Sequence, residues 1–148
     1  MKRLIIIVSV IFLIGIVLHG VYYLFLKRTP ESLLKTSFNI SLNDFYYTIE
    51  TFNEQWFPNG NGHVLVIYKF NKLTKENIDY LIEFGLQPLP VSEIDIQRMS
   101  YNKIPKEYFI SDTGYYVFLE ESVCDKRDYK FFLVDTKKKI AVLYYQNM

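Results

Sequence analysis

Residues 58–70 read PNGNGHVLVIYKF, a turn followed by an apolar run as long as one β-strand. Gly and Asn tolerate the positive φ angles of tight hairpin turns, so this turn is expected to join two antiparallel strands. The preceding run, Asp44–Phe57, is rich in Phe, Tyr, Thr and Ile, which suit a pleated surface. The following run, His63–Phe70, places apolar side chains on both faces, beginning with Val64 and Leu65. We therefore expect it to be a central, well-covered strand.

Helices are expected on either side of this hairpin. Pro30 suits the first turn of a helix, which predicts a short helix over Glu31–Ser37. After the hairpin, Leu73–Gly85 changes to a helical period. Thr74 can cap its start, and Gly85 can end it in a left-handed conformation.

The end of the chain predicts an antiparallel meander. Residues 91–113 are expected to form an irregular connection that has room for one helical turn. Three strands are expected beyond them: Gly114–Glu120, Tyr129–Asp135 and Lys139–Tyr145. The predicted order α-β-β-α-β-β-β is typical of an α+β domain, with a small antiparallel sheet of about five strands covered by helices on one face.

The amino-terminal segment differs in composition from the rest of the chain. Leu4–Leu26 is 23 residues long and carries no formal charge when His19 is neutral. As a helix it would be about 34 Å long, enough to cross a hydrocarbon core of about 30 Å. We therefore predict a transmembrane signal-anchor over residues 1–28, which enters the bilayer through residues 4–26, followed by one domain over residues 29–148.

The alternative for this segment is a cleaved secretory signal. Its apolar run is longer than the usual h-region, and no A-x-A-like cleavage site follows it. The basic residues Lys2 and Arg3 precede the run, and a short basic tail favours the cytoplasmic side. We expect a single-pass protein of the cell membrane, with its carboxy-terminal domain outside the cytoplasm.

Charge and composition exclude several classes of function. The chain has a net charge of +1, but residues 29–148 carry 13 Lys and Arg against 16 Asp and Glu, a net charge of −3. This balance disfavours nucleic-acid binding. A single cysteine excludes a disulfide scaffold, and two histidines leave little for a zinc site.

The candidate catalytic and metal-binding groups are weak. Cys124 and His63 come from different predicted elements, and nothing near them is typical of a cysteine hydrolase. Glu50 and Glu54 would lie about 13 Å apart along one strand face, too far for a retaining glycosidase pair. The turn Asn59–Gly62 lacks the carboxylates of a calcium loop. We assign no catalytic, cofactor-binding or metal-binding residue and expect no enzyme, with a hydrolase that uses an unrecognised carboxylate site as the less favoured alternative.

Two surfaces of residues 29–148 are candidates for binding a partner. One is the aromatic-rich sheet face that the helices leave uncovered. The other is the hairpin tip with Trp56, Asn59 and Asn61. Ordinary packing of Trp56 against the core is the competing interpretation.

The layout resembles that of uncharacterised small bacterial single-pass membrane proteins with a compact α+β domain. The features that carry this resemblance are Lys2-Arg3, Leu4–Leu26, Pro30, Asn59–Gly62, Gln87-Pro88-Leu89-Pro90 and the closing stretch FFLVDTKKKIAVLYY at 131–145. Because these features are structural, the resemblance implies a fold and a location but no site residues.

These observations predict a membrane protein that presents a non-enzymatic interaction domain to an unknown protein or envelope partner. The alternative is a membrane-associated inhibitor or immunity-type protein, whose acidic domain would cover a basic partner.

Overall fold

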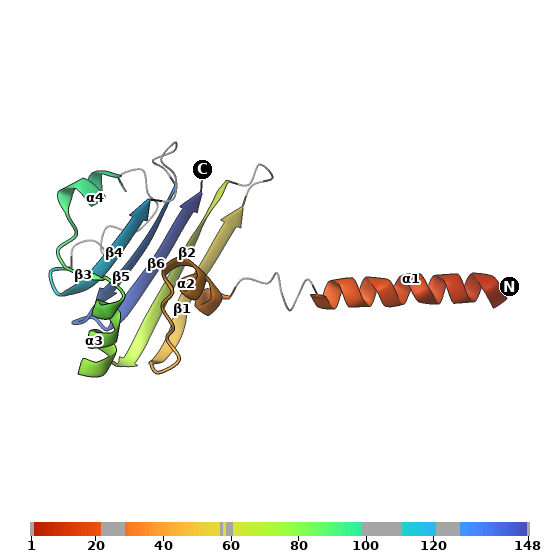
Figure 1. The fold of residues 1–148 in the computed structure, drawn as a ribbon, viewed down its shortest axis with the longest axis horizontal. Helices are drawn as coiled ribbons and strands as arrows, with labels where there is room; N and C mark the ends of the chain where they lie inside the picture. The colour runs from red at the N-terminus through yellow and green to blue at the C-terminus, as the bar shows by residue number, and fades with distance from the viewer. Residues whose placement is uncertain are drawn as a thin grey trace.

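The computed structural model describes residues 2–21, 29–56, 58, 61–98, 111–120 and 128–147. Helix α1 (Lys2–Val21) lies apart from the other elements, which form an α+β domain around one sheet (Figure 1). Among these residues, no helix combines the length and the apolar composition that crossing a membrane requires.

The domain has an antiparallel sheet of six strands in the order β1-β2-β6-β5-β4-β3. The strands are β1 (Tyr46–Trp56), β2 (Gly62–Lys72), β3 (Gln87–Pro88), β4 (Gly114–Glu120), β5 (Tyr129–Asp135) and β6 (Ile140–Asn147). The helices of the domain are α2 (Pro30–Phe38), α3 (Lys75–Glu83) and α4 (Glu93–Arg98). The α+β class and the antiparallel sheet are therefore as predicted. The sheet has one strand more than expected, because the two residues of β3 extend it at the edge beside β4.

Both helices predicted around the hairpin are present, and their caps explain their bounds. At α2 the Ser32 amide donates to Thr29 Oγ1 over 3.1 Å, and the Thr29 amide donates to Ser32 Oγ over 2.9 Å. The corresponding pair at α3 is Thr74 and Asn77. Such reciprocal bonds satisfy amides that the first helical turn leaves without intrahelical partners. Gly85 has φ +83°, the left-handed conformation expected where α3 ends.

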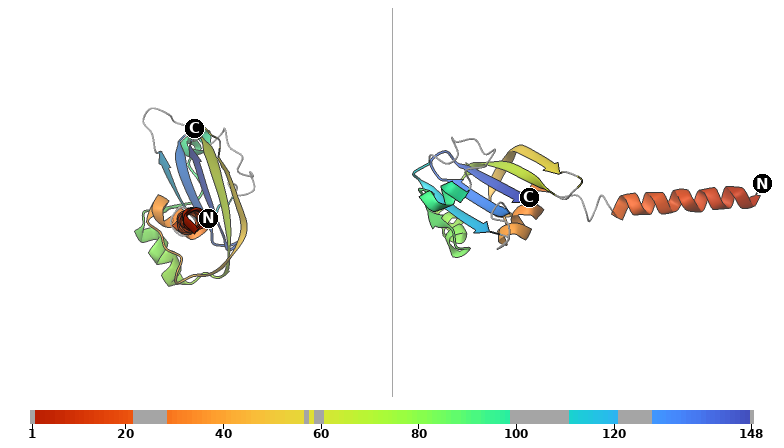
Figure 2. Two further views of the ribbon diagram at one scale, coloured as in Figure 1. Left: turned by 90° about the vertical axis from the view of Figure 1, so that its right-hand side faces the viewer. Right: turned by 90° about the horizontal axis from the view of Figure 1, so that it is seen from above.

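Helices α2 and α3 lie on the same side of the sheet (Figure 2). There they cover a core that includes Leu34, Leu81, Val66 and Phe132, which are at most 1% exposed. In α3 the fully covered residue is Leu81, whereas its neighbour Ile82 is 41% exposed.

The opposite face of the sheet has its own core, so the prediction that helices lie on one face only is wrong. Leu89 and Val91, which lead into α4, pack there with Tyr116 and Phe131. The Ser92 amide donates to the Tyr116 hydroxyl over 3.1 Å, and this hydroxyl donates to Asp95 of α4. Burial of apolar side chains on both faces of β5 and β6 requires cover on both sides of the sheet.

The link between β5 and β6 is held by one carboxylate. Asp135 is 2% exposed, and its Oδ1 accepts a 2.7 Å hydrogen bond from the Lys138 amide. Lys139 has φ +55°, and its carbonyl accepts a 2.8 Å bond from the Phe70 amide in β2. This turn therefore closes the last hairpin and also connects it to the central strand.

Candidate interaction surface

The aromatic side chains on the second face of the sheet do not form an exposed surface. Tyr116, Tyr129, Phe131 and Tyr144 are at most 3% exposed. The expectation of an open aromatic face is therefore wrong, because these rings are core residues.

Four of the rings on this face form a zigzag row across four strands. Phe118 stacks on Tyr129 with a centroid separation of 5.4 Å, and Tyr129 stacks on Tyr144 at 5.8 Å. His63 stacks on Tyr144 at 6.2 Å, with 20° between the ring planes. His63 is thus the end of an aromatic row. Cys124, the other member of the dyad considered from the sequence, lies outside the described residues.

Hydrogen bonds inside this row satisfy its buried hydroxyls. The Tyr144 hydroxyl donates to Gln146 Oε1 over 2.9 Å, and Tyr129 is hydrogen-bonded to Tyr144. Burial raises the pKa of Tyr144 to about 12 and also raises the pKa of Tyr129. Both phenols stay neutral at physiological pH, as is usual for tyrosines packed in a core.

The two carboxylates of β1 considered from the sequence, Glu50 and Glu54, differ in their local strand geometry. Glu54 lies opposite Val64 in a regular part of β1, whereas a register irregularity falls between Ile49 and Thr51, where Glu50 lies. The irregularity interrupts the regular alternation of side chains along β1. The separation of Glu50 and Glu54 expected from the sequence, about 13 Å along one strand face, assumed that this alternation was unbroken. No group of three His, Cys, Asp or Glu side chains in the described part of the chain is arranged to hold a metal ion.

A cavity of about 250 Å³ lies where α3 begins, lined by Asp44, Phe45, Glu76, Asn77 and Tyr80. Its polar groups serve the local fold. The Asn77 side-chain amide donates to the Asp44 carbonyl over 3.3 Å, and the Tyr80 hydroxyl accepts from the Ser41 amide over 3.0 Å. Hydrogen bonds from the Glu76 amide and the Thr74 hydroxyl lower the pKa of the Glu76 carboxyl. These contacts explain the cavity as part of the cap of α3.

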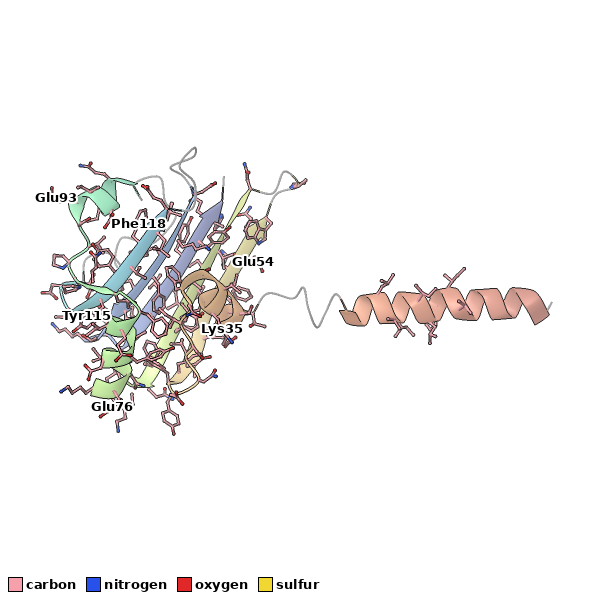
Figure 3. All side chains as sticks on the ribbon, viewed as in Figure 1. Lys35, Glu54, Glu76, Glu93, Tyr115 and Phe118 are labelled. Atoms are coloured by element: carbon pink, nitrogen blue, oxygen red, sulfur yellow. The ribbon has the colours of Figure 1, made fainter. Side chains whose placement is uncertain are left out.

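The remaining candidate for an interaction surface is the second half of strand β1, residues Thr51–Trp56, which we call the acidic edge. β1 is the outermost strand of the sheet, and most of its side chains are exposed. Phe52 is 42% exposed, and Glu54 lies two residues further on the same face of the strand. Figure 3 shows Glu54 at this margin of the sheet, away from α3 and α4.

Trp56 organises the end of the acidic edge. Its ring lies over Gly62, its cross-strand partner, and packs against Tyr145 with a centroid separation of 5.9 Å. Its indole N–H donates to Glu54 Oε1 over 2.5 Å. Trp56 therefore packs against the core and also belongs to the candidate surface. One side of its ring is covered, and its N–H orients an exposed carboxylate.

The two asparagines predicted with Trp56 have different outcomes. Asn61 is half-buried directly before β2, and Asn59 lies outside the described residues. Phe52 and Glu54 belong to this surface but were not predicted as members of it from the sequence. A signal for them was present, because the predicted strand 44–57 contains acidic residues and no Lys or Arg.

Comparison of this chain with protein-family models, with curated proteins and with solved structures finds no match.

Proposed function

We propose that this chain is a single-pass membrane protein whose domain, residues 29–148, binds a protein partner and carries out no catalysis itself. The observation that carries this proposal is the acidic edge: an outermost strand with the exposed ring of Phe52 and a carboxylate oriented by Trp56. Tyr46, Ile49 and Phe52 of β1 are all at least 40% exposed, and contiguous apolar patches bordered by polar side chains mark protein interaction sites. Tethering at a membrane would raise the effective concentration of such a surface, so that a weak contact suffices.

The membrane location is supported by the apolar surface of the amino-terminal helix. The large side chains between Val10 and Leu18 in α1 are 49–71% exposed. An apolar helix surface of this kind needs lipid or protein to cover it. The uncharged run Leu4–Leu26 extends five residues past α1, and its 23 residues match the thickness of a bilayer.

Photocrosslinking from the acidic edge tests the interaction. A photoreactive amino acid would replace Phe52 in the full-length chain, with an identical probe at Ile82 on α3 as the matched control. We expect a protein adduct of defined mass from position 52 that position 82 does not form, and we expect the added change Glu54→Lys to abolish it. Equal adducts from the two positions would contradict the proposed surface.

The membrane location has a separate test. Full-length protein should remain in the membrane fraction after alkaline carbonate extraction. An engineered cysteine at the exposed position Lys137, in a Cys124→Ser background, should react with an impermeant maleimide in intact cells. Protein found in the supernatant after extraction would contradict the membrane anchor. Labelling of the cysteine only after cell lysis would contradict the proposed orientation.

An inhibitor or immunity-type protein is the second candidate. It is favoured by the net charge of −3 on residues 29–148 and by the acidic edge. Attraction between an acidic and a basic surface weakens with salt. A crosslinked partner whose binding does not change between low and high salt would exclude this candidate and leave the interaction domain in place.

A further inference from the structure

We propose that the acidic edge binds an extended basic segment of its partner by adding that segment to the sheet as a further strand beside β1. This inference rests on the proposed function and names the chemistry of the partner. Three features of β1 carry it: an open edge, a local excess of negative charge, and a regular alternation of side chains.

The first feature is the open edge. β1 and the two-residue strand β3 are the outermost strands of the described sheet, so β1 is its only long edge. An edge strand directs a row of backbone N–H and C=O groups away from the sheet, and natural edges are blocked by Lys, Pro or bulges. β1 contains neither Lys nor Pro. Its register irregularities lie between Tyr46 and Tyr47 and between Ile49 and Thr51. The six residues after the second one form a regular edge about 20 Å long.

The second feature is charge. Glu50 and Glu54 are the charged residues of β1. The basic residues of β2, Lys69 and Lys72, pair with Thr48 and Tyr46 at the other end of the strand. Beside the acidic edge, β2 runs from Gly62 to Ile67 without a formal charge when His63 is neutral. Lys130 of β5 lies farther inside the sheet, with its Nζ 5.5 Å from the centroid of the Tyr145 ring. A strand added beside β1 that carries Lys or Arg would therefore meet the carboxylates of Glu50 and Glu54 first, and opposite-charge neighbours stabilise strand pairs.

The third feature gives the pattern of the partner. Phe52, Glu54 and Trp56 lie opposite Val66, Val64 and Gly62, on the face that also carries α2. Thr51, Asn53 and Gln55 point to the other face. The added segment should therefore alternate, with its basic side chains on the face of Phe52 and Glu54 and its apolar side chains on the other face.

A second copy of the chain fits this edge less well. Self-pairing of β1 would bring Glu50 and Glu54 of both copies to one interface without a basic residue in either strand. Like charges on neighbouring strands destabilise pairing. Charge complementarity therefore favours a basic partner over a homodimer.

Titration with a defined peptide tests the inference. The probe is an eight-residue peptide that alternates lysine and valine, added to full-length protein in detergent micelles. Trp56 is the single tryptophan of the chain, so its fluorescence reports binding at the acidic edge. We expect saturable binding, a loss of at least tenfold in affinity for Glu54→Lys, and no change for Glu83→Lys, which makes the same charge change on α3.

A second peptide separates strand addition from simple charge attraction. Methylation of alternate backbone amides keeps the side chains and the charge but removes the donors that pair with an edge strand. We expect the methylated peptide to lose at least tenfold in affinity. The inference would be overturned if both peptides bound equally, if Glu83→Lys weakened binding as much as Glu54→Lys, or if neither peptide bound. A dimer that Glu54→Lys dissociates would also overturn it.

The outcomes distinguish this inference from the proposed function. A position-specific adduct at residue 52 together with equal binding of both peptides would retain the interaction surface and reject strand addition. Selective binding of the unmethylated peptide without any adduct in membranes would show a competent edge and reject the proposed function.

Discussion

The hydroxyl of Tyr68 in the central strand β2 donates a 2.7 Å hydrogen bond to the carbonyl oxygen of Pro30, the first residue of α2. The donor is fully buried, and the bond joins residues 38 positions apart. Near it, the Tyr47 hydroxyl donates to Glu31 Oε1 over 2.9 Å at an exposed site. Two tyrosines of the first hairpin thus hold the start of α2, where the chain enters the domain from its amino-terminal segment.

Tyr68→Phe should destabilise the domain by about 1 kcal/mol, because a buried hydrogen bond is lost while the packing of the ring is kept. Urea unfolding of the full-length chain, followed by Trp56 fluorescence, measures this loss. Tyr47→Phe is the matched control and should cost less, because water can replace its partner. An equal loss for the two variants would show that the bond from Tyr68 to Pro30 has no special role.

Gly62→Ala should destabilise the domain by about 1–3 kcal/mol, the usual cost of overpacking. A Cβ atom at this position would contact the ring of Trp56 and the carbonyl of Gln55. The emission of Trp56 should shift as the ring moves. Gly15→Ala is the control, since no atom lies within 4 Å of a Cβ there, and it should cause no loss of stability. Unchanged emission and stability for Gly62→Ala would contradict the placement of the indole.

Thr74→Ala should lower stability by about 1 kcal/mol, because it removes the cap of α3. The Asn77 amide donates to Thr74 Oγ1 over 3.2 Å, and the variant leaves this amide without its acceptor. Hydrogen exchange of the amides in Lys75–Glu83 should accelerate more than exchange in β5. Thr74→Ser keeps the oxygen and should restore protection, so failure of serine to rescue would argue against the cap.

The domain should lose stability in alkali between pH 10 and 12. Burial raises the pKa of Tyr144 to about 12, and burial with the bond to Glu31 raises the pKa of Tyr47 to about 12. Below pH 10 the folded and unfolded states both keep these protons. Above it the unfolded chain loses them first, so the unfolded state is increasingly favoured.

Melting temperatures measured by circular dichroism from pH 9 to 12 test this decline. Tyr144→Phe should make the decline shallower, whereas Tyr46→Phe, at a tyrosine that is 75% exposed, should leave it unchanged. A melting temperature independent of pH over this range would contradict the burial of Tyr144.

Local patterns were sufficient to predict most elements of the domain. The strands Gly114–Glu120 and Tyr129–Asp135 have the predicted bounds, and Thr74 and Gly85 flank α3 as their residue types indicate. These features depend on turn chemistry, capping and side-chain alternation, which act within a few residues of the chain.

Pairing between distant segments was decided by the tertiary structure. β2 pairs with β6, about 75 residues later, and this contact makes β1 an edge and β2 a central strand. It also determines that Tyr129 and Tyr144 are buried while Phe52 is exposed. Composition cannot distinguish these aromatic residues, because an aromatic side chain suits a core and a binding surface equally. Which strands become neighbours depends on how the whole chain buries its apolar area, and the acidic edge exists only as a result of that arrangement.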